Sequence, residues 1–471
     1  MSGASGTGFW DEATFVLPDD KNPLKFSPAK KARVVVAGLV ITINSALGSS
    51  LPGGAAKEIG EAFSITSPMR LVLLNSLYML GFALGPLIFG PLSEYIGRRP
   101  VLIGTYLTYM VFTFGCAVSP NFTALLIFRW LCGTAAAAPN AVIGPLFADI
   151  FNQPGPRGRS MAYFMCATSM TPPFGPIISG YTSGTSWRLT FWIGLAFAGA
   201  CLPPVLFLPE TYSPLLKRKY LQENTVGLID EKGANLPHEL KTVFSRPFVM
   251  VYQEPVVLFS SLYLALIYAT LYLFFQAYPI IFQGVYGLSS GEVGLVFLPV
   301  SAGSVIALFL FLWYASYHSS AMKAGEPWAM RIEYRRLPLA CIGGPAVVTS
   351  LFWLGWTSYP SIHPTVPAML GLLFGTGYLV IFMALLNYIA DAYREFSASA
   401  QAAASTLRSV TAVCLPLAAP GMYKSLGNHW SCSMLALFTL VLSCIPFVFI
   451  RYGEVLRKRS PFCQKLSLVD P

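Results

Sequence analysis

The sequence predicts an all-α membrane protein with twelve transmembrane helices, and two observations lead to this prediction. The first is composition: of the 471 residues, 55% are hydrophobic and only 11% are charged, and the mean hydropathy is +0.59. Soluble domains carry about a quarter charged residues. The second is a series of twelve apolar runs, each of about twenty residues and therefore long enough to cross a hydrocarbon core of roughly 30 Å. Most of the chain is expected to lie in lipid.

The longest interval between apolar runs divides the expected spans six and six. We expect a disordered tail over 1–33, a first six-helix bundle over 34–209, a linker over 210–254, a second six-helix bundle over 255–450 and a tail over 451–471. The expected spans are 34–54, 70–91, 101–119, 123–148, 160–182, 189–208, 255–281, 291–315, 337–357, 365–390, 397–420 and 431–450.

Basic residues set the expected orientation. An even number of spans places both termini on one side, and 25 of the 31 Lys and Arg residues fall in the tails and loops of that side. The opposite face carries four, which are Lys57, Arg70, Arg188 and Lys424. Cytoplasmic loops of membrane proteins are enriched in Lys and Arg. We therefore expect both tails and the linker to be cytoplasmic, in the plasma membrane or, as an alternative, in an organelle membrane.

A charged turn, Gly90–Pro100, separates two apolar runs. Gly90 and Gly97 permit close helix approach, and Glu94 can meet a helix N-terminus or an arginine. Arg98 and Arg99 hold the turn on the positive side of the membrane. We expect a gating role for these five residues, with a loop that only sets topology as the alternative.

The turn resembles the signature loop between helices 2 and 3 of the major facilitator superfamily. The matching residues are Gly90, Ser93, Glu94, Gly97, Arg98 and Arg99. Tyr95 departs from the pattern, because many members carry a basic residue there. The resemblance implies the major facilitator fold, in which two pseudo-symmetric six-helix bundles rock about a central site. It also implies that Glu94 and Arg98 latch the two halves in one access state.

Two further motifs resemble the same superfamily. Arg129 and Gly133, four residues apart, are similar to its fourth-helix motif, which is linked to proton coupling in the family. The stretch Pro172–Gly180 is similar to its antiporter motif, with Gly175, Pro176 and Gly180 retained. Prolines bend a helix and glycines let a neighbouring helix approach, so this stretch is expected to help seal the cavity. A packing kink is the alternative.

Three stretches narrow the resemblance to one branch. Leu208–Tyr212, Tyr272–Pro279 and Asn387–Tyr393 are similar to the fungal drug–proton antiporters, a branch that includes polyamine, multidrug and organic-acid exporters. The resemblance implies a secondary transporter, not an enzyme. The sequence contains no G-x-x-x-x-G-K-[ST] motif for a nucleotide, which favours transport driven by a gradient.

Two arginines are the candidate substrate ligands. Arg129 and Arg408 lie well inside expected spans, whereas no Asp, Glu or Lys does. An intramembrane charge costs at least about 2.5 kcal/mol and is a functional candidate by default. Without an opposing acid, each guanidinium would attract an anion. The alternative is that each guanidinium bonds backbone carbonyls and nearby amides.

Other candidate ligands are uncharged. Tyr268, Tyr272 and Gln276 recur at i, i+4 and i+8, so they share one helix face, which the resemblance places on the cavity. Asn387 could add a hydrogen bond. The four histidines are scattered and the cysteines form no C-x-x-C pair, so we expect neither a metal nor a cofactor.

The leading hypothesis is a monomeric exporter of a small organic anion by alternating access. The cargo would be a di- or tricarboxylic acid such as citrate or itaconate, with proton coupling as an option. The expected partners are this cargo and the lipid bilayer, not nucleic acid. The 14% of aromatic residues supports an alternative cargo of drugs, secondary metabolites or glycolipids. Polyamines fit less well, because they require buried acids. A non-transporting membrane sensor is the remote alternative.

Overall fold

The computed structural model describes residues 17–224, 249–393, 397–462 and 464, which are predominantly helical. The N-terminal half contains α1 (Pro28–Ser50), α2 (Ala56–Ala62), α3 (Pro68–Ile96), α4 (Arg98–Ala117), α5 (Phe122–Ala136), α6 (Ala138–Ile150), α7 (Pro154–Met170), α8 (Phe174–Thr182), α9 (Trp187–Ala200), α10 (Leu202–Leu206) and α11 (Ser213–Asn224). The C-terminal half contains α13 (Pro255–Tyr278), α14 (Ser290–Leu295), α15 (Leu298–Lys323), α16 (Ile332–Thr357), α17 (Thr365–Ala368), α18 (Leu370–Tyr393), α19 (Ser397–Ser443) and α20 (Ile445–Arg459). Short 3-10 turns are η1 (Pro23–Lys25), η2 (Gly53–Ala55) and η4 (Pro327–Met330), and η3 (Pro279–Gln283) is a π-helical turn.

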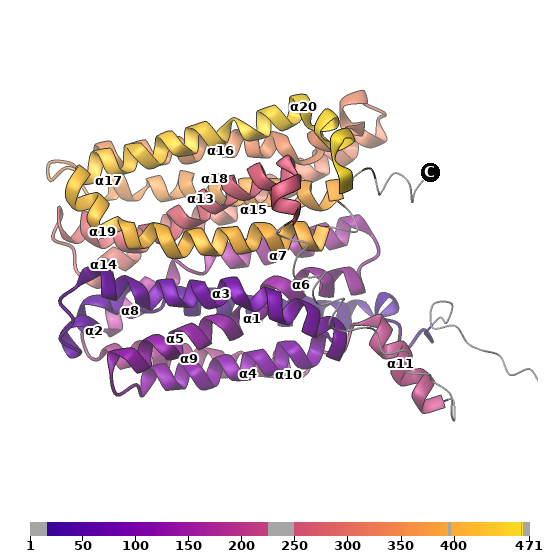
Figure 1. Ribbon diagram of the computed structural model, residues 1–471, viewed down its shortest axis with the longest axis horizontal. Coiled ribbons are helices and arrows are strands. Elements are labelled where there is room, and N and C mark those ends of the chain that lie inside the picture. The colour runs from indigo at the N-terminus through magenta and orange to yellow at the C-terminus, as the bar shows by residue number, and fades with distance from the viewer. Residues whose placement is uncertain (1–16, 225–248, 394–396, 463, 465–471) are drawn as a thin grey trace, which may run out of the picture.

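The two halves lie side by side as two layers of roughly parallel and antiparallel helices. Figure 1 shows the N-terminal half, in indigo to magenta, below the C-terminal half, in pink to yellow. Helices α2, α8, α14 and α17 lie at one end of the bundle, which we call the far end. Helix α11 and the last turns of α20 lie at the other, which we call the linker end (Figure 1).

The predicted fold class is confirmed, and most expected spans appear as continuous helices. Within the described residues, nine helical segments are long and apolar enough to cross a membrane. One of them, 399–459, is 61 residues long and holds two expected spans, which are divided near Gly427 where φ is +73°. The expected spans 160–182 and 189–208 are each broken at a proline pair, into α7 with α8 and α9 with α10. Proline removes a backbone donor and clashes with the preceding turn, so it interrupts the helix.

Parts of both expected tails are helical. Residues 1–16 and 465–471 lie outside the described residues, but α1 already begins at Pro28, where the Ser27 hydroxyl caps the helix. Phe26 is buried against the bundle. At the other terminus, α20 continues to Arg459, and Arg457 pairs with Glu333 of α16. The helices extend past the expected membrane edge because these contacts hold them. The expected linker likewise opens with a helix, α11.

Candidate functional site

The two halves meet tightly at the far end. The Ser49 hydroxyl of α1 and the Tyr272 hydroxyl of α13 lie 3.0 Å apart in a hydrogen bond. Gly180 of α8 lies directly against the backbone of Ser290 in α14, so close that a Cβ at position 180 would overlap the Ser290 carbonyl. Helices α8 and α14 therefore close the far end of the interface, and Gly180 permits the contact. A gating role for Gly180 stays a prediction.

A cavity of about 220 Å³ lies between the halves on the linker-end side of this closure. Helices α3, α6 and α7 supply one wall, and α13, α18 and α19 supply the other. Most of the lining is apolar or aromatic, and among the described residues Arg408 is its one cation and Glu94 its one carboxylate. The two halves thus enclose an apolar chamber with a single positive charge on the α19 wall.

Arg408 is held loosely by the chamber wall. Its guanidinium lies over the rings of Tyr268 and Phe382, with centroid distances of 4.9 and 5.3 Å, and donates one hydrogen bond to the Ser405 hydroxyl at 3.3 Å. Its Nε is buried and has no hydrogen-bond partner in the described structure, where no carboxylate lies within ion-pair distance. The charge is positioned by aromatic faces and keeps donors free for a ligand.

Arg129 has a different environment. Its three nitrogens donate to the carbonyl oxygens of Leu74, Gly48 and Ser49 at 2.9, 2.7 and 3.1 Å, and its guanidinium lies over the Tyr78 ring. The side chain is only 2% exposed and does not line the chamber in this conformation. This geometry matches the alternative in which the guanidinium bonds backbone carbonyls. Arg129 therefore links α5 to α3 and α1 through hydrogen bonds. A role in cargo binding stays a prediction.

Tyr268, Tyr272 and Gln276 lie on one face of α13, as expected, but the three side chains have different surroundings, because the contact that closes the interface lies at the middle one. Tyr268 lines the chamber, Tyr272 bonds Ser49 in the closure, and Gln276 lines a second cavity at the far end. Asn387 does not line the chamber in this conformation, and its amide donates to the Met383 carbonyl one turn earlier at 2.6 Å. Of the six predicted cargo ligands, the structure thus brings Arg408 and Tyr268 together.

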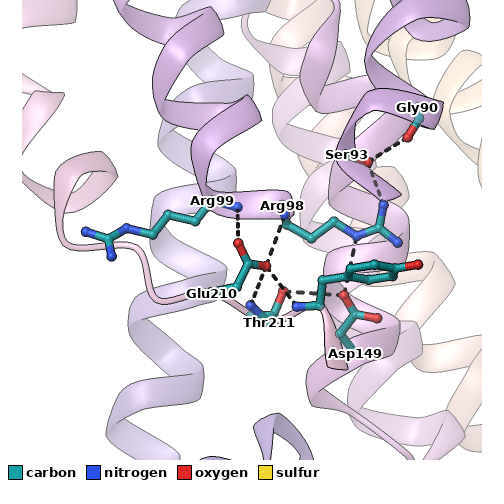
Figure 2. Close-up of polar contacts among 8 residues, drawn as sticks. Gly90, Ser93, Arg98, Arg99, Asp149, Glu210 and Thr211 are labelled. Carbon is teal, nitrogen blue, oxygen red and sulfur yellow. Dashed lines mark hydrogen bonds and ion pairs between the residues drawn. The ribbon is translucent and has the colours of Figure 1, made fainter. Parts of the chain in front are cut away.

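The turn between α3 and α4 is held by a cluster of charges at the linker end (Figure 2). The Glu210 carboxylate accepts the backbone N–H groups of Arg98 and Arg99 at 3.0 and 3.1 Å and so caps the N-terminus of α4. It also accepts the N–H groups of Thr211 and Tyr212. Gly97 has φ of +104°, and a Cβ there would press on the Glu210 carboxylate. Glycine is therefore required at this position.

Arg98 links the turn to the end of α6. Its buried guanidinium donates to the Ser93 hydroxyl at 2.6 Å and reaches the Asp149 carboxylate at 3.5 Å, as Figure 2 shows. The Ser93 hydroxyl in turn donates to the Gly90 carbonyl at 2.7 Å. All these contacts lie within the N-terminal half, so the expected latch between the halves stays a prediction for another conformation.

Glu94 does not take the place that the sequence suggested for it. It is exposed and lines the mouth of the chamber, and Glu210 occupies the helix N-terminus in its stead. Sequence reasoning missed the roles of Glu210 and Asp149. The available signals were the position of Asp149 at the end of an apolar run and of Glu210 in the stretch Leu208–Tyr212. The Arg99 side chain is exposed, and only its backbone joins the cluster.

The C-terminal half repeats this arrangement with different residues. Arg336, near the start of α16, pairs with Asp391, near the end of α18, at 3.3 Å. In the N-terminal half, Arg98 at the start of α4 pairs with Asp149 near the end of α6. Each half therefore ties the third of its expected spans to the fourth at the linker end. Such repetition is what two pseudo-symmetric bundles predict.

We expect Glu210→Gln to weaken the turn measurably. An amide oxygen lacks the charge that favours the α4 N-terminus, a loss of about 0.5–2 kcal/mol. The apparent melting temperature of the purified protein should fall by about 0.5–2 °C, given a chain of 471 residues. The matched control is Glu454→Gln, which removes an exposed carboxylate whose ion-pair partner in the described structure is Lys458, one turn away. Equal melting temperatures for the two variants would contradict the capping role.

Comparison with known proteins gives a family and relatives. The model of the Major Facilitator Superfamily matches residues 36–416. Efflux pump FUB11 of Gibberella moniliformis (strain M3125 / FGSC 7600) is 34% identical over 466 residues, which cover 96% of this chain and 78% of the relative. Major facilitator superfamily multidrug transporter mdrA of Aspergillus fumigatus (strain Af293) is 36% identical over 471 residues, which cover 96% of this chain and 76% of the relative.

Solved structures agree on the fold. The proton:xylose symporter XylE aligns with a TM-score of 0.64 at 13% identity, covering 91% of this chain and 96% of that one. The human organic anion transporter MFSD10 (TETRAN) aligns with a TM-score of 0.58 at 18% identity, covering 89% of this chain and 100% of that one. At these identities the similarity concerns architecture alone.

Proposed function

The chain belongs to the major facilitator superfamily of transporters, and on that premise we propose that it exports organic anions whose carboxylate binds Arg408. The relatives named as efflux pump and multidrug transporter support the direction of transport. The single observation that supports an anionic cargo is the cation of the chamber, which has a buried, unpartnered Nε and no ion-pair partner among the described residues. An intramembrane cation in that state attracts a carboxylate.

The residues that line the chamber suggest which class of organic anion it binds. The chamber that Arg408 lines is also lined by Tyr378, Phe382 and Met165, which offer aromatic and polarizable surfaces for an apolar body. One guanidinium can neutralise one carboxylate. The cavity therefore favours an amphiphilic cargo with a single carboxylate over the di- or tricarboxylic acids that the sequence suggested.

The direction of the cavity fits loading from the cytoplasm. We take the linker end as cytoplasmic, because most of the basic residues lie there. The chamber then reaches the cytoplasmic side at Glu94, while the contacts of Gly180 and Ser49 close the opposite side. Alternating access requires the halves to part at the far end in the next step.

A second candidate function is export of uncharged amphiphilic compounds. It is favoured by the largely apolar chamber wall and by Glu94 at its mouth, which would repel an anion at long range. In this alternative Arg408 would serve to orient polar groups and would not select charge.

A charge series on one ring system tests the proposal. We would measure uptake of naphthoate, naphthamide and naphthylmethylammonium into inside-out vesicles that contain the wild-type chain. The three compounds share one aromatic ring system and are similar in size, so they differ mainly in the charge of the polar group. We expect naphthoate to be transported at least about tenfold faster than the amide, since a charge-assisted hydrogen bond contributes about 1.5–3 kcal/mol. Equal rates for acid and amide would support the second candidate, and preference for the amine would exclude both.

A further inference from the structure

A second cavity, of about 380 Å³, lies at the far end, beyond the closure between the halves. One wall comes from η2, α2, α3 and α8 of the N-terminal half, and the other from α13, η3, α14 and α19 of the C-terminal half. The polar groups that line it include Lys57, Lys424, Gln276 and Gln283, and no carboxylate of the described residues lines it. We call it the far vestibule.

The two lysines of the far vestibule carry unpaired charges from opposite halves. Lys57 belongs to α2 and Lys424 to α19, and neither has a hydrogen bond or an ion pair in the described structure. The nearby Glu292 is engaged by the backbone and hydroxyl of Ser289. Glu58, which follows Lys57 in α2, does not line the cavity. The sequence places four Lys and Arg residues on this face, and two of them line this one cavity.

The other two cations of the face are placed differently. Arg188 donates to the carbonyl oxygens of Ala117 and Ser119 at 2.8 and 2.9 Å, so its guanidinium is used in packing. Arg70 is exposed and does not line the vestibule. The concentration of free positive charge in the vestibule is therefore a property of Lys57 and Lys424, and not of the face as a whole.

We propose that the far vestibule is a second organic-carboxylate site, which receives the anion after Arg408 and which Lys57 and Lys424 form together. The proposal deepens the proposed function, since it assumes the same cargo class. The amides of Gln276 and Gln283 supply donors for carboxylate oxygens, and Phe275 and Phe297 supply aromatic surface for an apolar body. The exposed lysines hold an anion more weakly than Arg408, because solvent screens their charge.

One helix face connects the two sites. Tyr268 lies beside Arg408, Tyr272 forms the closure, and Gln276 lines the vestibule, each one turn beyond the last on α13. Separation of Ser49 from Tyr272 would join the chamber to the vestibule along this face. The anion would then pass from the tighter cationic site to the weaker one, which is the order that release requires.

The vestibule site also has a consequence for the conformational equilibrium. Because Lys57 and Lys424 come from opposite halves, an anion that contacts both links the halves at the far end. A ligand that binds one conformation better shifts the population toward it. Anion on the far side should therefore favour the conformation that is closed at the far end and slow export.

Equilibrium dialysis of labelled naphthoate against the purified full chain in nanodiscs, at low ionic strength, tests the site. We expect two naphthoate molecules per wild-type chain at saturation. Lys57→Gln/Lys424→Gln should lose the weaker one, Arg408→Gln should lose the tighter one, and the matched control Arg70→Gln should keep both. In vesicles, inhibition of export by far-side naphthoate should disappear in the double lysine variant only.

The outcomes separate this inference from the proposed function. If the double lysine variant binds and is inhibited like the wild type, the vestibule site is overturned while the Arg408 site stands. If Arg408→Gln keeps the tighter molecule while the lysine variant loses the weaker one, the vestibule site stands and the proposed function fails. Loss of one molecule in Arg70→Gln would show that face charge alone is responsible, which also overturns the inference.

Discussion

Arg408→Gln should lower the affinity for naphthoate about 10- to 100-fold and leave the fold intact. The loss follows from removing a charge-assisted contact of about 1.5–3 kcal/mol. The fold should tolerate the change because Arg408 donates only one hydrogen bond, to Ser405, and rests otherwise on the faces of Tyr268 and Phe382. The measurement is the concentration dependence of naphthoate transport, together with the apparent melting temperature of the purified variant.

Two further variants make this prediction specific. Arg408→Lys keeps the charge but loses the planar fork that stacks on aromatic rings, so it should recover part of the affinity. Arg129→Gln removes hydrogen bonds to three buried carbonyl oxygens. Those of Gly48 and Ser49 lie in the last turn of α1, where carbonyls lack partners within the helix, and an unpaired buried acceptor costs about 1–3 kcal/mol. It should lower the yield and the melting temperature, and the naphthoate affinity of the protein that folds tests the sequence prediction that Arg129 also binds cargo. An unchanged naphthoate affinity in Arg408→Gln would remove the basis for an anionic cargo.

The fold could be predicted from the sequence because the lipid environment restricts the possible backbone structures. Each span must satisfy its own backbone hydrogen bonds, so apolar runs of sufficient length become helices. The helix ends were less accessible, since Ser27 and Glu333 hold helical turns beyond the membrane edge. The internal breaks follow from prolines, yet Pro416 lies inside the uninterrupted part of α19 that precedes Gly427. A proline alone therefore does not tell where a span divides.

Only part of the candidate site could be predicted from the sequence. Arg408 and Arg129 look alike in sequence, because each is a lone arginine in an apolar run. What separates them is the set of carbonyls that α1 and α3 present to Arg129 and not to Arg408. The pairing of Arg98 with Asp149 spans 51 residues, and its contact with Glu210 spans 112. No local sequence pattern predicts contacts between residues so far apart in the chain. The shared face of α13 could be predicted because its residues recur every four positions.

Gly133→Ala should destabilise the protein strongly, although it adds only one methyl group. A Cβ at this position would fall on the backbone carbonyl of Tyr78, where α5 crosses α3, and a backbone atom cannot turn aside as a flexible side chain can. Overpacking typically costs about 1–3 kcal/mol and more where the backbone must move. We therefore expect at least about 3 kcal/mol, which for a chain of 471 residues corresponds to a fall in apparent melting temperature of roughly 3 °C or more.

Gly104→Ala is the matched control for this substitution, since it makes the same chemical change in the neighbouring helix α4. No atom of a neighbouring element lies within 4 Å of the Cβ position at Gly104. Alanine there should be neutral or stabilise the helix by up to about 1 kcal/mol, because it restricts the unfolded backbone. Scanning fluorimetry of both purified variants measures the difference. A melting temperature for Gly133→Ala within a degree of that for Gly104→Ala would mean that α3 and α5 can separate without cost. The close packing of α3 against α5 at Gly133 would then contribute little to the stability of the N-terminal half. The same would hold for the hydrogen bonds of Arg129, which depend on the same two helices.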